Sequence, residues 1–152
     1  MATHTHEPHT TQLPETFKAE LLERIYKIPC IEGFNMTITH LELGRCELSA
    51  PRNPQLDGIF ECVHGGILAT LADTAACFAI MTHTGTEQIL STTDMNIRFL
   101  APCLTTVKVV AQVIKPGKLL CPVQVDLYDE HEKHVATAQV TYIRLNTMPK
   151  RP

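Results

Sequence analysis

The chain has 152 residues, 44% of them hydrophobic and 19% charged, and these proportions exclude a disordered chain, a coiled coil or a collagen-like repeat. Its 13 Lys and Arg against 16 Asp and Glu give a net charge of −3, which argues against a surface built to bind nucleic acid. A chain of this length forms one domain with a hydrophobic core of its own. We expect that domain over residues 13–146, with a disordered segment at 1–12 and a polar tail at 147–152.

The cysteines are unsuited to a metal site, because no two of them are closer than fifteen positions. Residues 1–11 contain no apolar stretch of the kind that a secretory signal carries. We therefore expect reduced, mostly buried thiols in a cytoplasmic protein. The longest apolar run, 67–81, is too short to span a bilayer and carries an acid at its middle, so we expect no membrane segment.

The first half of the chain predicts a helix followed by strands. Residues 14–27 have the spacing of an amphipathic helix, which Pro29 ends. Residues 35–50 alternate as strands do and are interrupted at Gly44. The stretch 51–61 is rich in Pro, Asn, Asp and Gly, and it predicts a loop.

The second half predicts one buried helix and four strands. Residues 63–82 are apolar on nearly every face, which is typical of a buried helix. The strand segments that follow are rich in Val, Ile and Thr, and the short breaks between them predict antiparallel hairpins. These strand segments are 88–100, 105–115, 118–128 and 134–145. One antiparallel sheet curled around the helix is the simplest α+β arrangement.

The segment that carries most chemical information is His64-Gly65-Gly66, at the start of the buried helix. Two glycines allow another group to approach the backbone closely. The first turn of a helix has N–H groups without partners, and the helix dipole adds positive potential there. This helix start therefore suits an oxyanion.

Asp73 follows His64 by nine residues and shares a helix face with Thr70, Thr74 and Cys77. A carboxylate in apolar surroundings is a stronger base, so Asp73 fits a general base or a nucleophile. A structural alternative stays open at this point. A buried aspartate can simply pair with an arginine such as Arg98, and a glycine pair can simply allow close helix packing.

The run HGGILATLADTA, at 64–75, resembles hotdog-fold thioesterases of the PaaI-like and 4-hydroxybenzoyl-CoA thioesterase branches. The run STTDMNIRFLAP, at 91–102, resembles the strand that leaves the central helix of that family, and KPGK at 115–118 resembles its next hairpin. The resemblance covers roughly residues 35–145. It implies the hotdog fold, an antiparallel sheet wrapped around one long buried helix, here with an extra N-terminal helix.

This resemblance also implies an activity, the hydrolysis of an acyl- or aryl-CoA thioester to the free acid and CoA. The backbone N–H of Gly65, with that of Gly66, would hold the thioester carbonyl oxygen. Asp73 would act as general base or nucleophile, His64 would set the start of the helix, and Thr92 would bring a hydroxyl near the water. The reaction needs no metal and no organic cofactor, since CoA belongs to the substrate.

Further candidate substrate contacts include one departure from the family pattern. Cys77 stands where one branch has threonine. Relatives often carry Asn or Gln seven residues before the first glycine of the motif, and this chain has Gly58 there. Asn53, in the same loop, is a candidate substitute, as are Gln55 and Asp57.

Four cations are candidate contacts to the CoA phosphates, namely Lys115, Lys118, Arg98 and Arg52. For the two lysines, an ordinary solvated hairpin tip is an equal alternative. A single curled sheet leaves an exposed edge strand and an open pocket. Hotdog relatives close both by pairing subunits, with the acid of one chain facing the glycine N–H groups of the other. The resemblance therefore implies a homodimer, or a homotetramer of two such dimers.

Two other functions remain open from the sequence. A non-catalytic acyl-CoA-binding hotdog protein is favoured by Gly58, which stands in place of an amide side chain. A hotdog dehydratase or hydratase would use a histidine–acid pair, and no motif of that kind is evident. Nucleic acid and membranes are not expected among the partners.

Overall fold

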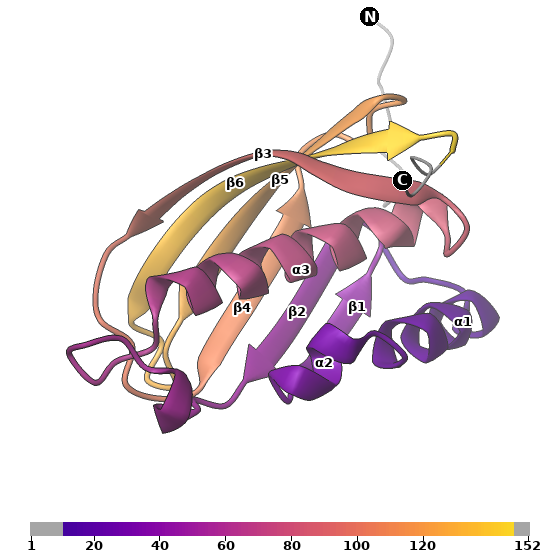
Figure 1. The fold of residues 1–152 in the computed structure, drawn as a ribbon. Helices are drawn as coiled ribbons and strands as arrows, with labels where there is room; N and C mark the ends of the chain where they lie inside the picture. Colours follow the sequence, from indigo (N-terminus) through magenta and orange to yellow (C-terminus); the bar gives the residue numbers. More distant parts are fainter. Residues whose placement is uncertain (1–10, 148–152) are drawn as a thin grey trace, which may run out of the picture.

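A 20-residue helix, α3 (Gly65–Thr84), lies in the curl of a six-stranded antiparallel sheet in the computed structural model of this chain (Figure 1). The structure describes residues 11–147, so most of the segments expected at 1–12 and 147–152 fall outside the described residues. An additional helix, α1 (Glu15–Tyr26), precedes the sheet. The expected α+β architecture is thus confirmed. In chain order the strands are β1 (Thr37–Glu42), β2 (Arg45–Ala50), β3 (Ile89–Phe99), β4 (Val107–Val113), β5 (Leu120–Tyr128) and β6 (His134–Leu145).

The order of the strands in the sheet is β1-β2-β4-β5-β6-β3. The hairpin expected between the segments 88–100 and 105–115 is therefore wrong, because β3 pairs with β6 and β4 lies between β2 and β5. A short connection between two strand segments shows that the chain reverses direction, but it does not show that the two strands pair with each other. Because β3 takes the far edge, the sheet encloses α3 from both sides (Figure 1). The expected hairpin at 115–118 does join β4 to β5.

A short helix that the sequence pattern did not predict, α2 (Pro29–Gly33), follows α1 directly. Pro29 was expected only to end the first helix, but it occupies the first position of α2. Proline suits that position because its fixed φ is already helical and no N–H is needed there. The proline therefore both ends α1 and starts α2.

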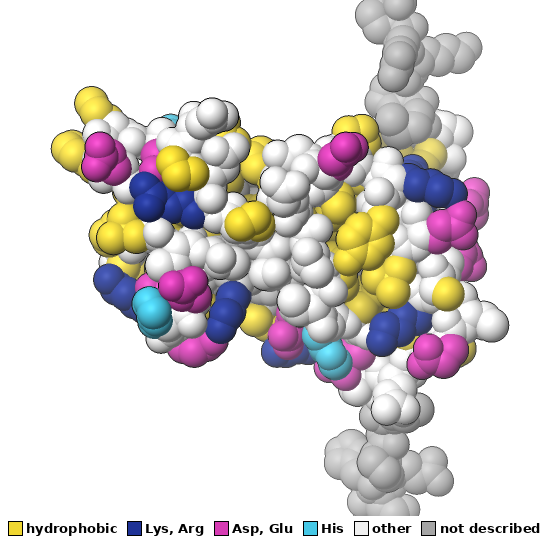
Figure 2. Space-filling view, turned by 90° about the horizontal axis from the view of Figure 1, so that it is seen from below, with side chains coloured by type: hydrophobic (Ala, Val, Ile, Leu, Met, Phe, Trp, Pro, Cys, Tyr) yellow, Lys and Arg dark blue, Asp and Glu magenta, His cyan; other side chains and the backbone are white. Residues whose placement is uncertain are grey.

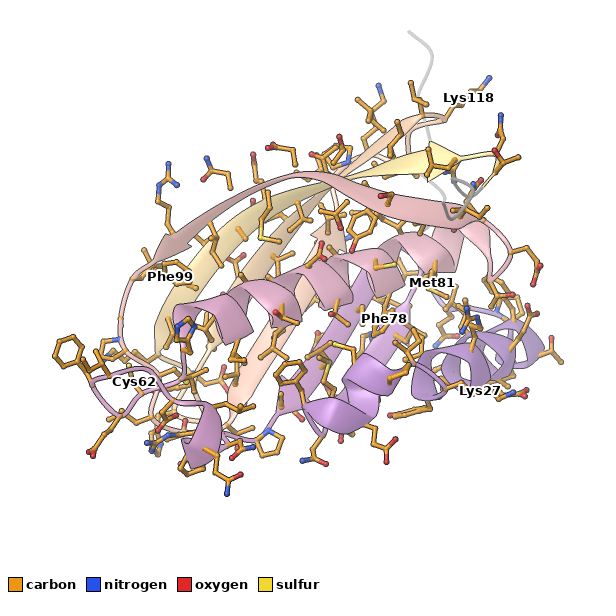
Figure 3. All side chains as sticks on the ribbon, viewed as in Figure 1. Lys27, Cys62, Phe78, Met81, Phe99 and Lys118 are labelled. Carbon is orange, nitrogen blue, oxygen red and sulfur yellow. The ribbon has the colours of Figure 1, made fainter. Side chains whose placement is uncertain are left out.

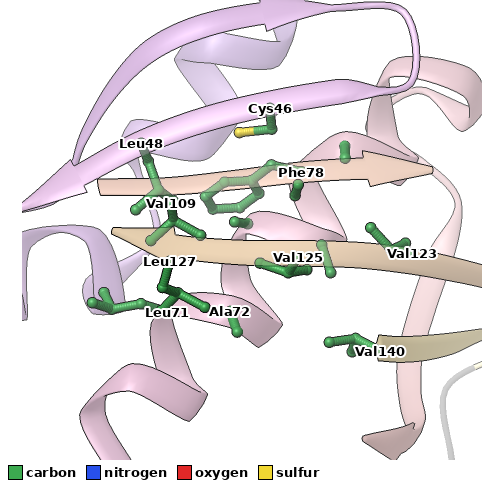
Figure 4. Packing of buried hydrophobic residues seen from close by; sticks show 14 of the residues in the cluster. Cys46, Leu48, Leu71, Ala72, Phe78, Val109, Val123, Val125, Leu127 and Val140 are labelled. Carbon is green, nitrogen blue, oxygen red and sulfur yellow. The ribbon is translucent and has the colours of Figure 1, made fainter. Parts of the chain in front are cut away.

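The core lies between α3 and the inner face of the sheet. Phe78 points from α3 toward the strands and packs near Cys46, Leu48 and Val109, all of which are buried (Figure 4). The alanines of α3 on the same side are also fully buried, and their small side chains let the helix approach the sheet closely. By length and composition α3 could cross a membrane, and just over half of its apolar window is buried inside the protein. Packing against the sheet accounts for that apolar composition.

The loop that precedes α3 is fixed by one arginine. Arg52 forms an ion pair with the carboxylate of Asp57, with its Nε 3.0 Å from Oδ2. The same guanidinium donates to the carbonyl oxygens of Glu61 at 2.8 Å and of Leu104 at 3.2 Å. Arg52 therefore links two parts of the loop before α3 to each other and links that loop to the connection between β3 and β4. The pair also lowers the pKa of Asp57 below its ordinary value.

The Arg52–Asp57 pair predicts a pH-dependent contribution to stability. A carboxylate whose pKa is lower in the folded state stabilises the fold above its unfolded pKa, and this contribution is lost as the pH falls through the folded pKa. We expect Arg52→Gln to lower the urea midpoint at pH 7, and the gap to wild type to shrink as the pH falls below about 4. In an Asp57→Asn background the effect of Arg52→Gln should lose this pH dependence. A gap that stays constant from pH 7 to pH 3 would contradict the assignment.

Candidate active site

The first turn of α3 offers one free backbone N–H. His64 caps the helix, and its ring Nδ1 accepts a hydrogen bond from the N–H of Gly66 at 2.9 Å. The N–H groups of Ile67 and Leu68 both donate to the carbonyl oxygen of His64. Within residues 11–147 no acceptor lies against the N–H of Gly65. Of the two glycines expected to hold a substrate oxygen, the geometry therefore leaves Gly65 available, while Gly66 is engaged by the capping ring.

A groove of about 400 Å³ opens beside Gly65. The ring of Phe99, at the end of β3, closes one side of it, and a Cβ on Gly65 would lie 3.2 Å from that ring. A side chain at this position would therefore require the ring of Phe99 to move by a few tenths of an ångström. Phe99 and Cys62 both lie at the end of the molecule where α3 begins (Figure 3). The groove is lined by Cys62, Val63, Gly65, Leu68, Phe99, Leu100, Ala101, Pro102 and Cys103.

Two of the three loop candidates for an amide partner, Asn53 and Asp57, are engaged within the loop itself, while the side chain of Gln55 makes no hydrogen bond in the described residues. The side chain of Asn53 accepts a hydrogen bond from the N–H of Gln55 at 3.0 Å and caps the short helix η1 (Pro54–Leu56). The carboxylate of Asp57 is paired with Arg52. At Gly58 the backbone N–H donates to the carbonyl oxygen of Cys62 at 2.9 Å. The described structure therefore commits Asn53 and Asp57 to holding the loop.

Asp73 lies halfway along α3 and faces the sheet edge formed by β6 and β3. Its Oδ1 accepts a hydrogen bond from Thr92 at 2.8 Å and one from the hydroxyl of Tyr142 at 2.9 Å. Within the described chain, Oδ2 accepts none. Cys77 lies one helical turn further on, where burial and the nearby charge of Asp73 raise the pKa of its thiol to about 12. Thr92, expected to bring a hydroxyl near the water, has its hydroxyl on Asp73, and the other carboxylate oxygen has no hydrogen-bond partner among the described residues.

Sequence reasoning missed Tyr142. Position 142 looks like one more inward residue in the alternating pattern of β6, and the resemblance does not extend a role to it. The available signal was chemical, since a buried tyrosine hydroxyl needs a hydrogen-bond partner. A bulge in β3 between Thr92 and Asp94 also went unpredicted.

The candidate cations are not brought together with Asp73 in this chain. Arg98 donates to the side chain of Asn96 at 2.6 Å and lines a shallow groove on the sheet with residues of β5 and β6. The alternative in which Arg98 neutralises Asp73 is therefore not realised. Lys115 and Lys118 flank the turn between β4 and β5, and Lys118 lies at the end of the molecule opposite Phe99 (Figure 3). Among the described residues no cluster of three His, Cys, Asp or Glu side chains could hold a metal ion.

The two reactive groups of the motif are far apart within one chain. Gly65 and Asp73 are separated by eight residues of continuous α-helix. At 1.5 Å per residue this separation is roughly 12 Å along the helix axis. A carbonyl oxygen bound to the Gly65 N–H therefore lies beyond contact with Asp73 of the same chain.

Comparisons with known proteins identify the family of the chain and one curated relative. A family model described as "Domain of unknown function (DUF4442)" matches residues 19–143. The mouse protein named acyl-coenzyme A thioesterase 13 is 29% identical over 118 residues, covering 71% of this chain and 79% of that protein.

Solved structures share the fold at low identity. A thioesterase family protein from Silicibacter pomeroyi superposes with a TM-score of 0.78 at 24% identity, over 85% of this chain and 98% of that one. The Escherichia coli PaaI protein, from the phenylacetic acid degradation operon, superposes with a TM-score of 0.77 at 20% identity, over 87% and 98% of the two chains. Both likenesses show the hotdog arrangement of one helix in a curled sheet. With the family match over most of its length, the chain belongs to the DUF4442 family, and it has the hotdog fold.

Proposed function

We propose that this protein hydrolyses acyl-CoA or aryl-CoA thioesters to the free acid and CoA. The observation that carries the proposal is the helix start, where capping by His64 leaves the N–H of Gly65 as a free donor beside an open groove. The Asp73 carboxylate, with one oxygen free, supplies the second chemical group that the reaction needs. The name of the mouse relative, an acyl-coenzyme A thioesterase, supports this substrate class.

In the proposed reaction, the thioester carbonyl oxygen accepts a hydrogen bond from the N–H of Gly65. The dipole of α3 stabilises the negative charge that develops on that oxygen. Asp73 either removes a proton from the attacking water or attacks the carbonyl carbon itself, forming an anhydride that water then hydrolyses. In both routes the C–S bond breaks, the acid is released and CoA leaves as the thiol after taking up a proton.

We propose that one catalytic site needs two copies of the chain, since about 12 Å separates Gly65 from Asp73 within one helix. In the described residues β3 is an edge strand of eleven residues, paired on one side only. Antiparallel pairing of two β3 strands would set two α3 helices side by side in opposite directions, so that Gly65 of each chain faces Asp73 of the other. A homodimer, or a tetramer of two such dimers, is the proposed working unit.

Exposed apolar side chains at the start of α3 support this assembly. Ile59 is 90% exposed and Phe60 86% exposed, and Phe99 and Leu100 are each more than half exposed. Hydrophobic side chains protrude at the end of the molecule where the loop before α3 lies (Figure 2). Burial against a second copy would remove this apolar surface from water.

The proposed antiparallel dimer also brings two lysines of one chain toward the proposed site at Gly65 of the other chain. In that dimer, the β4–β5 hairpin of one chain, with Lys115 and Lys118, lies near the start of α3 of the other chain, where Gly65 is. This position supports both lysines as contacts to the CoA phosphates. We propose that the reaction uses neither a metal ion nor an organic cofactor. We propose a cytoplasmic location, which is supported by six cysteines that are all unpaired.

For the acyl group we propose the cavity of about 190 Å³ on the side of α3 that faces α2. Its lining is mostly apolar and includes Phe34, Ile67 and Leu71, and it shares Val63 with the groove at Gly65. An apolar cavity of about 150 Å³ is sufficient for benzene. This volume therefore favours an aryl or medium-chain acyl group over a long chain.

A binding protein without turnover is the second candidate. Gly58 stands where relatives often have an amide side chain, and Asn53 is engaged in capping η1. A panel of phenylacetyl-CoA, hexanoyl-CoA and palmitoyl-CoA separates the two functions. Release of free thiol supports the enzyme, and micromolar binding without thiol release supports the binding protein.

The first prediction concerns Asp73. Asp73→Asn keeps the shape of the side chain but removes its basicity, so the hydrolysis rate should fall by about 100-fold or more. The melting temperature should stay close to that of wild type, because the amide oxygen still accepts hydrogen bonds from Thr92 and Tyr142. Thiol release is followed with a thiol-reactive dye. Turnover close to wild type would remove Asp73 from the mechanism.

The second prediction isolates the N–H of Gly65. Proline lacks an N–H yet suits the first helical position, and His64, with φ −59° and ψ 136°, already has the conformation preferred before proline. Gly65→Ala is the matched control, because it adds a Cβ against Phe99 but keeps the N–H.

We expect Gly65→Pro to lower kcat by about 10²- to 10³-fold relative to Gly65→Ala, with both variants folded by circular dichroism. Equal rates in the two variants would mean that this N–H does not hold the substrate oxygen.

A further inference from the structure

The hydroxyl of Tyr142 donates to Asp73, and it also lies close to Thr92 and to the thiol of Cys77. The tyrosine is 5% exposed, and its hydroxyl oxygen lies 2.9 Å from the backbone carbonyl oxygen of Asp73 and 2.9 Å from its Oδ1. A hydroxyl carries a single proton, so these two acceptors share it. The strand β6 thus holds both the main chain and the side chain of one helical residue.

Thr92 approaches the same carboxylate oxygen from the neighbouring strand. Thr92 and Tyr142 are direct partners in the register of β3 and β6, and Oδ1 of Asp73 accepts a hydrogen bond from each. The last torsion of an aspartate side chain has broad energy minima, so a carboxylate without partners rotates freely. Two donors on one oxygen fix the carboxylate plane and leave Oδ2 as the oxygen that faces a reactant.

Two ionisable side chains near Asp73, Tyr142 and Cys77, are neutral groups rather than competing charges. Burial raises the pKa of Tyr142 far above its ordinary value, and it raises the pKa of the Cys77 thiol to about 12. Both groups are therefore protonated at neutral pH.

We infer that Tyr142 is a positioning residue for the reaction, acting through Asp73 and never on the substrate itself. This inference rests on the proposed thioesterase function. Asp73 supplies the reacting oxygen, and Tyr142 and Thr92 hold the carboxylate in the orientation that the reaction needs.

The test is a double-mutant cycle with Tyr142→Phe and Asp73→Asn, measured as acyl-CoA hydrolysis. We expect Tyr142→Phe to lower kcat about tenfold, as for the loss of one hydrogen bond to a charged group, with KM changed less than twofold. In the Asp73→Asn background the same substitution should cause no further loss, because its effect passes through the carboxylate. The matched control is Tyr128→Phe, on β5, whose ring stacks on His134 and whose hydroxyl makes no hydrogen bond in the described residues. This control should keep the wild-type kcat.

The outcomes separate the inference from the function on which it rests. An active wild type whose Tyr142→Phe variant keeps kcat within twofold overturns the inference alone. So does a loss that multiplies with that of Asp73→Asn, since this indicates a general structural effect. A wild type that releases no thiol overturns the proposed function, and the inference falls with it.

Discussion

The rigidity of one buried helix governs the chemistry of this protein. Eight residues of α3 hold the N–H of Gly65 and the carboxylate of Asp73 roughly 12 Å apart, and the helix cannot bend to close that gap. Its side chains, with Phe78 at the centre, are locked into the sheet. Under the proposed function each chain therefore carries two halves of different sites, and a second copy completes them.

The same helix determines what each half contributes. At its start, the ring of His64 satisfies the N–H of Gly66 and leaves that of Gly65 free, so the cap selects one donor out of two. Near its middle, two strands hold one oxygen of Asp73 and leave the other open. In both places the protein uses hydrogen bonds to restrict a group that could otherwise act in several directions. The two groups left without partners in the described part of the chain, the N–H of Gly65 and Oδ2 of Asp73, are the ones that the proposed reaction uses.

The sequence was sufficient for the elements and for the motif, because both depend on local patterns. Alternation in residues 35–50, together with the Val, Ile and Thr content of the later segments and the breaks between them, located all six strands within two residues at each end. The glycine pair and Asp73 stood out because such residues are unusual in an otherwise apolar helix. The resemblance singled out Thr92 as a hydroxyl near the water, while its hydrogen bond to Asp73, at 2.8 Å, emerges only from the structure.

What the sequence could not predict depends on contacts between distant segments. The place of β3 beside β6 follows from how the sheet closes around α3, which no local pattern encodes. Tyr142 lies 69 residues from Asp73 along the chain, and its hydrogen bonds exist only once that closure has occurred. The clamp made by Arg52 likewise joins two loops that no spacing rule connects.

The central claim, that one catalytic site takes Gly65 from one chain and Asp73 from another, is tested most directly by mixing two inactive variants. Chains carrying Gly65→Pro are unfolded and refolded together with an equal amount of chains carrying Asp73→Asn. Random pairing makes half of the dimers mixed, and each mixed dimer has one intact site out of two, so about a quarter of wild-type activity should return. Activity that stays at the level of the separate variants would contradict the shared site.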